Sequence, residues 1–141
     1  MTTPCTGRCH CGSIAYEASP PFGTTSHCHC EDCRRSHSAA FVTWTSASRA
    51  NFRFARGGEL LSLHESHPGV RWGFCSRCGT SFYYETSEEP EVAYFTLASL
   101  DDEKAAPRPT CHYSFEERAD WMASVDSLPS YRGKTHDPSS G

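Results

Sequence analysis

The sequence predicts an all-β domain built from small antiparallel sheets, with at most short helical turns. Short segments rich in β-branched and aromatic residues recur along the 141 residues, as is typical of strands. The 10 Gly and 9 Pro are spread between these segments, which favours many turns over long helices. The length suits one domain, expected over residues 1–132. Residues 133–141 contain no apolar side chain and are predicted to be disordered.

The strands are expected in a regular series. Residues 13–18 alternate apolar with polar or small side chains until Pro20, Pro21 and Gly23 break the pattern, and residues 40–45 are aromatic and β-branched. The other predicted strands have a similar composition and lie between turn residues: 25–28, 52–55, 60–64, 71–74, 81–85 and 91–97. Helical structure is expected only as a turn over 31–37 and a brief helix over 116–122.

The charge pattern excludes several classes of partner. The formal net charge is -4, and the 13 Lys and Arg form no basic tract, so neither nucleic acid nor an anionic membrane surface is an expected partner. No apolar run approaches the length of a membrane span, and the first residues lack the apolar core of a secretory signal. We therefore expect a cytoplasmic protein. In that reducing compartment, closely spaced cysteines indicate metal ligands rather than disulfides.

Seven of the nine cysteines fall into three clusters: Cys9 and Cys11; Cys28, Cys30 and Cys33; Cys75 and Cys78. A structural zinc site takes four protein ligands, whereas a reactive zinc site takes three and keeps one exchangeable position. The two pairs each end in glycine, which suits tight metal-binding turns, and together they would supply four ligands. A pairing of Cys9 and Cys11 with part of the triplet stays open. The count predicts two Zn²⁺ ions per chain.

The triplet is the candidate catalytic centre. Cys28, Cys30 and Cys33 would hold a zinc whose fourth position is available to a substrate. A fourth ligand from His27, His29, His37 or Cys111 would instead make this site structural. Zinc bound by three thiolates is a weak Lewis acid. Such a centre favours binding a small-molecule thiol over hydrolysing an ester or peptide.

The order of these motifs resembles a known family. Gly7-x-Cys9-x-Cys11-Gly12 comes first, followed by Cys28-His29-Cys30-x-x-Cys33-Arg34-Arg35 and Phe74-Cys75-x-x-Cys78-Gly79. Leu100-Asp101-Asp102, His112, Trp121 and Leu128-Pro129 complete a match over about residues 7–131. The chain resembles the glutathione-dependent formaldehyde-activating family, which includes S-(hydroxymethyl)glutathione synthase and centromere protein V.

The resemblance implies a β-tent, or Mss4-like, architecture and a carbon–sulfur lyase or synthase. It implies a structural zinc on Cys9, Cys11, Cys75 and Cys78, and a catalytic zinc on the triplet. The implied reaction joins formaldehyde to the thiol of glutathione. Because glutathione carries two carboxylates, we expect the side chains nearest the motifs to contact it: Arg34, Arg35, Arg71 and His37.

The chain departs from the family pattern beside the triplet. The family usually has a glycine soon after the arginine pair, where this chain reads Ser36-His37-Ser38-Ala39, so the pocket rim is expected to differ. Cys5 is interpreted as an incidental terminal thiol and Trp121 as a core residue. For His112, a packing role and a functional role are equally compatible with the sequence.

Two other functions fit the same residues. One is a non-catalytic, zinc-stabilised domain that binds a protein or carries glutathione, as the centromere protein V relationship suggests. The other is a redox or metal-handling protein whose triplet is oxidised or loaded reversibly. The sequence leaves the oligomeric state open.

Overall fold

The computed structural model describes residues 3–133. Residues 134–141, the main part of the tail predicted to be disordered, lie outside the described residues. The described chain forms two β-sheets and a single short α-helix, so the all-β prediction is confirmed.

The smaller sheet has the order β1-β2-β5 and consists of β1 (Cys5–Arg8), β2 (Ala15–Ala18) and β5 (Phe52–Arg56). The larger sheet has the order β10-β3-β4-β9-β8-β7-β6. Its strands are β10 (Cys111–Tyr113), β3 (Ser26–Cys28), β4 (Val42–Ser48), β9 (Val92–Thr96), β8 (Ser81–Thr86), β7 (Val70–Cys75) and β6 (Leu61–His67). All pairings are antiparallel except that of β10 with β3, which is parallel.

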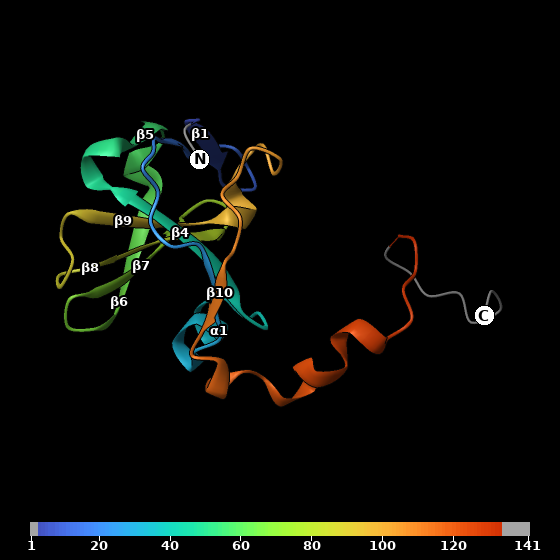
Figure 1. The fold of residues 1–141 in the computed structure, drawn as a ribbon. Coiled ribbons are helices and arrows are strands. Elements are labelled where there is room, and N and C mark those ends of the chain that lie inside the picture. The colour runs from blue at the N-terminus through green and yellow to red at the C-terminus, as the bar shows by residue number, and fades with distance from the viewer. Residues whose placement is uncertain (1–2, 134–141) are drawn as a thin grey trace.

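Helical segments connect these strands. The α-helix α1 (Glu31–His37) follows β3 directly and lies at one end of the larger sheet, beside β10 (Figure 1). The remaining helical segments are 3₁₀ turns: Arg49–Asn51, Gly58–Leu60, Leu97–Ser99, Phe115–Glu117 and Asp120–Ser127. The last of these runs away from both sheets (Figure 1).

An aromatic core joins the two sheets. Tyr16 of β2 is fully buried, and its ring stacks on Phe52 of β5 at 5.2 Å and on Phe82 of β8 at 5.6 Å between centroids. Its hydroxyl shares a hydrogen bond of 2.6 Å with Ser99 Oγ, which satisfies a polar group that would otherwise be buried unpaired. A Cβ at Gly7 would overlap the Tyr16 ring, so only glycine fits opposite it on β1.

A second apolar cluster lies where α1 meets the larger sheet. It contains Cys33 of α1, Val42 and Trp44 of β4, and Trp72 of β7, all buried. Tyr84 and Tyr94 pack against it from the adjacent strands β8 and β9. One cysteine of the triplet is therefore built into a core.

Three predictions are wrong at the level of elements and burial. The helix expected over 116–122 is instead two 3₁₀ segments, because Arg118 between them has an extended backbone (φ -56°, ψ 150°). Cys5 is buried in β1 rather than being a loose terminal thiol, and Trp121 is 67 % exposed rather than part of the core. Strands β1 and β10 were not predicted.

Candidate metal centres and the adjoining cavity

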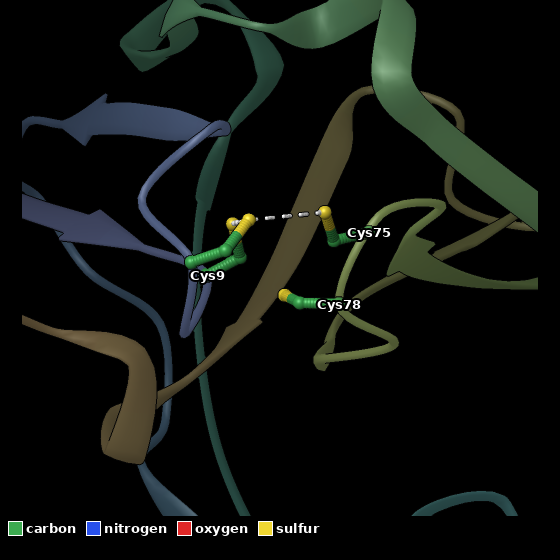
Figure 2. Close-up of side chains that lie close together, drawn as sticks. Cys9, Cys75 and Cys78 are labelled. Carbon is green, nitrogen blue, oxygen red and sulfur yellow. Dashed lines mark hydrogen bonds between the residues drawn. The ribbon is translucent and has the colours of Figure 1, made fainter.

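Two loops from different sheets bring four cysteines together. Cys9 and Cys11 lie in the β1–β2 loop, while Cys75 ends β7 and Cys78 follows it. Their sulfur atoms all lie within 4.8 Å of one another. The Cys9–Cys11 and Cys11–Cys75 sulfur pairs are 3.6 Å and 4.0 Å apart, close to the separation of about 3.8 Å expected for sulfurs around a tetrahedral zinc. Figure 2 shows Cys9 facing Cys75 and Cys78 across this gap.

Backbone and hydroxyl donors point at these sulfurs. The amides of Ile14 and Arg77 donate to Cys9 Sγ and Cys75 Sγ at 3.3 Å and 3.4 Å. Thr80 Oγ1 accepts from the His10 amide at 2.9 Å and lies 3.2 Å from Cys78 Sγ. A hydrogen bond from the Thr80 hydroxyl is the main reason that the pKa of Cys78 falls to about 5. Burial raises the pKa of Cys75, so within this cluster the thiolate, the form that binds metal, is favoured at Cys78 in particular.

The turns of this cluster depend on glycine. Gly12 and Gly79 have φ of 78° and 79°, a backbone region that favours glycine. Their amides donate to the carbonyls of Cys9 and Cys75 at 3.0 Å and 2.8 Å. The glycine that ends each cysteine pair thus closes the turn that holds the two sulfurs together.

The second cluster is the predicted triplet. Cys28 ends β3, Cys30 is the N-cap of α1, and Cys33 lies in the first turn of α1. Their sulfurs lie within 4.8 Å of one another. Cys30 Sγ accepts the N-cap hydrogen bond from the Cys33 amide at 3.3 Å. The strand end and the helix start therefore fix all three side chains.

The triplet is electrostatically asymmetric. A hydrogen bond with Cys33 is the main cause that lowers the pKa of Cys28 to about 6. The same bond, followed by burial, raises the pKa of Cys33. Burial raises the pKa of Cys30. The indole N–H of Trp44 lies 3.4 Å from Cys33 Sγ and donates to it.

None of the four candidate ligands joins the triplet within the described part of the chain. His27 Nδ1 lies 2.8 Å from Thr43 Oγ1, and the His37 ring packs edge-on against Trp44. Buried His29 pairs with His112 at 2.8 Å between Nε2 and Nδ1, which gives His112 a polar partner. Cys111 lies on β10 opposite Ser26. Among residues 3–133, the triplet therefore offers three sulfur ligands and no fourth ligand.

A cavity of about 510 Å³ opens directly onto Cys28, Cys30 and Cys33. Its largest lining side chains are aromatic and come from five strands of the larger sheet: Trp44 of β4, Tyr94 of β9, Tyr84 of β8, Trp72 of β7 and Tyr113 of β10. Two acidic residues, Asp32 of α1 and Glu89 of the β8–β9 loop, also line it. A cavity of this size can enclose a small organic molecule next to the sulfurs.

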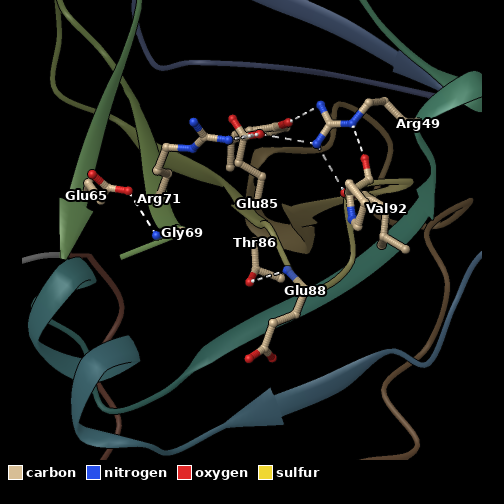
Figure 3. Close-up of polar contacts among 10 residues, drawn as sticks. Arg49, Glu65, Gly69, Arg71, Glu85, Thr86, Glu88 and Val92 are labelled. Atoms are coloured by element: carbon tan, nitrogen blue, oxygen red, sulfur yellow. Dashed lines mark hydrogen bonds and ion pairs between the residues drawn. The ribbon is translucent and has the colours of Figure 1, made fainter. Parts of the chain in front are cut away.

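The predicted substrate contacts lie outside this lining. Arg34 Nε donates to the His29 carbonyl at 3.1 Å, and Arg35 pairs with Glu31 at 3.0 Å. Arg71 pairs with Glu85 at 3.0 Å, and Glu85 also binds Arg49 at 3.3 Å (Figure 3). Val70 and Trp72 line the cavity, so the intervening Arg71 faces the other side of β7. Whether these arginines or His37 contact a substrate stays a prediction.

Sequence reasoning missed the aromatic wall. The alternation of Val70 with Trp72 could have indicated one face of a strand. It could not indicate that this face meets Trp44, Tyr84 and Tyr94 beside the triplet, because that depends on the order β4-β9-β8-β7.

The chain is similar to a described protein family and to a solved structure. The family model described as glutathione-dependent formaldehyde-activating enzyme matches residues 4–117. The chain belongs to this family. A solved structure described as a Rhodobacter sphaeroides protein has a TM-score of 0.63 and 25% sequence identity, and the match covers 77% of this chain and 99% of that chain. No curated protein matches the sequence.

The family relates the chain to glutathione and formaldehyde chemistry, and its two cysteine clusters could each hold a metal ion. Among the described residues, none of the helices has the length and apolar character needed to span a membrane.

Proposed function

We propose that this protein is a zinc-dependent enzyme that makes or breaks the carbon–sulfur bond between a small thiol and an aldehyde. The family description suggests glutathione and formaldehyde as the pair. The observation that carries the proposal is a three-cysteine cluster, with no fourth ligand among residues 3–133, that faces a cavity. Both proposed metal sites present only thiolate ligands, a donor set that suits zinc.

The two clusters would have different roles. Cys9, Cys11, Cys75 and Cys78 would hold a structural zinc that ties the β1–β2 loop to the end of β7. Cys28, Cys30 and Cys33 would hold a second zinc, which supplies stabilisation of a bound substrate thiolate.

The chain's own residues would position the reactants. The cavity would place a thiol next to the triplet sulfurs, with aromatic walls on one side of it. The Trp44 N–H fixes Cys33 Sγ on the floor of the cavity. In the addition, the substrate sulfur forms a bond to the aldehyde carbon and the carbonyl π electrons move to oxygen. The thiol proton ends on that oxygen, so no further reactant is needed.

Cys30→Ser is the sharpest test of the second site, because serine is also a good N-cap and would preserve the start of α1. We expect zinc analysis to give two ions per chain for wild type and one for Cys30→Ser, with the fold retained. Cys111→Ser, which changes a cysteine outside both clusters, is the control and should keep both.

Activity is measured as NMR exchange between free thiol and its formaldehyde adduct, since the addition also proceeds without an enzyme. We expect wild type and Cys111→Ser to accelerate the exchange and Cys30→Ser to lose the acceleration. A protein with both zincs that accelerates exchange for none of a panel of thiols would instead be a non-catalytic binding domain.

A further inference from the structure

The wall of the cavity is a continuous group of aromatic rings. Trp72 and Tyr84 have centroids 4.9 Å apart, Tyr84 and Tyr94 are 5.6 Å apart, and Trp44 lies 6.0 Å from Tyr84. The two tryptophans are each 8 % exposed, so they are held in place by the core behind them. Fixed, electron-rich rings attract cations.

The polar atoms of three of these rings are already used within the protein. Trp44 Nε1 donates to Cys33 Sγ at 3.4 Å, and Trp72 Nε1 donates to Ser66 Oγ at 2.8 Å. The Tyr94 hydroxyl donates to Glu89 Oε2 at 2.7 Å. These N–H and O–H groups are therefore not free to bind a carboxylate on a ligand.

The charged groups at the cavity are acidic. Asp32 and Glu89 line it, and the lining includes no Lys or Arg among the described residues; its one imidazole is that of His67. The Tyr94 hydrogen bond holds Glu89 against the aromatic wall. The triplet adds negative charge, because a zinc with three thiolates has a net charge of -1. A ligand with two carboxylates would enter against the like charge of Asp32, Glu89 and the triplet.

The nearest arginine on the larger sheet is not placed to neutralise the negative charge at the cavity. Arg71 lies on the opposite face of β7 from Trp72 and is paired with Glu85, whose side chain is 14% exposed. Moving Arg71 into the cavity would break that pair and leave Glu85 with Arg49 alone.

We propose that this cavity selects a small thiol that carries a positive charge, an aminothiol or its quaternary ammonium analogue, over a thiol that carries carboxylates. The ammonium group lies against Trp72, Tyr84 and Tyr94 and close to Glu89, while the sulfur faces Cys28, Cys30 and Cys33. The identity of the ligand as a thiol rests on the proposed function. Recognition of the positive charge rests on the cavity alone.

Choline and its uncharged carbon isostere 3,3-dimethyl-1-butanol test the charge recognition without any sulfur. Binding to the zinc-loaded protein is followed by the fluorescence of Trp44 and Trp72 in a Trp121→Phe background, which removes the third tryptophan. We expect choline to bind about tenfold or more tightly than the isostere. Equal affinity of the two compounds would overturn the proposal.

Glu89→Gln and Glu88→Gln are the matched variants, because both glutamates are exposed neighbours and only Glu89 lines the cavity. We expect Glu89→Gln to weaken choline binding by about threefold to tenfold, and Glu88→Gln to leave it within about twofold. An equal loss of choline affinity in both variants would show a general effect of surface charge and would overturn the assignment of the site.

Thiols then separate this inference from the proposed function. We expect thiocholine to bind more tightly than choline, and glutathione and 3-mercaptopropionate to bind more weakly than thiocholine. Tighter binding of glutathione would overturn the inference and leave the proposed enzyme intact. Choline binding with no gain from the thiol would leave the cation site intact and count against the thiol-binding function.

Discussion

Cys30 shows how one side chain can serve both a helix and a candidate metal site. Its sulfur accepts the amide of Cys33 as the N-cap of α1 and belongs to the triplet. The helix is only seven residues long, so its ends matter more than its interior for its stability. At the other end, Ser38 has left-handed backbone angles (φ 50°, ψ 48°), a conformation that favours glycine.

Ser38→Gly should therefore stabilise the protein by about 1 kcal/mol, because glycine adopts this conformation without steric cost. Ser38 lies in the segment where the family usually has a glycine. Urea unfolding measures the change. Ser36→Gly is the control and should lower stability by about 0.5 kcal/mol, since it puts glycine inside α1. A destabilising effect of Ser38→Gly would show that the serine side chain has a role of its own.

His37 makes a prediction about pH. Burial lowers the pKa of this imidazole to about 4, below its value of about 6.5 in the unfolded chain. Between these values the unfolded state binds the proton and the folded state does not. Stability is thus fully present above pH 6.5 and falls as the pH drops toward 4.

From pH 7.5 to 5.0, wild type should lose about 1–2 kcal/mol more unfolding free energy than His37→Phe, whose ring still packs against Trp44. Comparing the two proteins cancels any effect of acid on the cysteines that they share. His64→Phe changes an exposed histidine on β6 and should behave as wild type. Equal losses in wild type and His37→Phe would contradict the burial of a neutral imidazole.

At the scale of elements, most strands of the larger sheet could be predicted because their composition is locally strand-like. Residues 81–85, for example, were expected as a strand, and β8 spans Ser81–Thr86. β1 and β10 could not be, because they are short and are stabilised by partners distant in sequence. β10 pairs with β3 some 85 residues away. In β1, Gly7 forms a bridge with Leu100 and the Thr6 carbonyl accepts the Asp101 amide at 2.9 Å.

One part of the candidate site, the cysteine clusters, could be predicted from the sequence, and another part, the cavity, could not. The cysteine spacing predicted which sulfurs would meet, since each cluster is formed within a turn or between two turns. The cavity beside the triplet could not be predicted, because its aromatic rings come from five strands brought together only by the sheet order. Arg34 and Arg35, which follow the triplet in sequence, bind the His29 carbonyl and Glu31 instead of lining the cavity.

The segment after β10 gives a prediction at this scale. The family match ends at residue 117, and Trp121, Val125 and Leu128 are more than half exposed. Truncation after Asp120, which keeps buried Ala119, should change the unfolding free energy by less than about 1 kcal/mol. Truncation after Pro109 also removes β10 and should destabilise the protein markedly. Unfolding caused by the shorter deletion would show that this segment packs on the domain.

At the scale of the whole molecule, the four-cysteine cluster is a cross-link between the two sheets. It joins the β1–β2 loop to the end of β7 across 64 residues of sequence, next to the aromatic core around Tyr16. A structural zinc contributes on the order of 10 kcal/mol, comparable with the total stability of about 5–15 kcal/mol for a domain. The fold and this proposed metal site should therefore be lost together.

Cys9→Ser should unfold the protein at 25 °C, because Cys9 is buried and supplies one of the four sulfurs. Cys30→Ser should remain folded, since it affects only the triplet. Far-UV circular dichroism and the dispersion of NMR chemical shifts measure whether the protein is folded. A strong chelator added to wild type should reproduce the Cys9→Ser result. If chelated wild type stayed as stable as the zinc-loaded protein, the loss in Cys9→Ser would reflect packing alone. The two sheets would then be held together by the Tyr16 core without a metal cross-link.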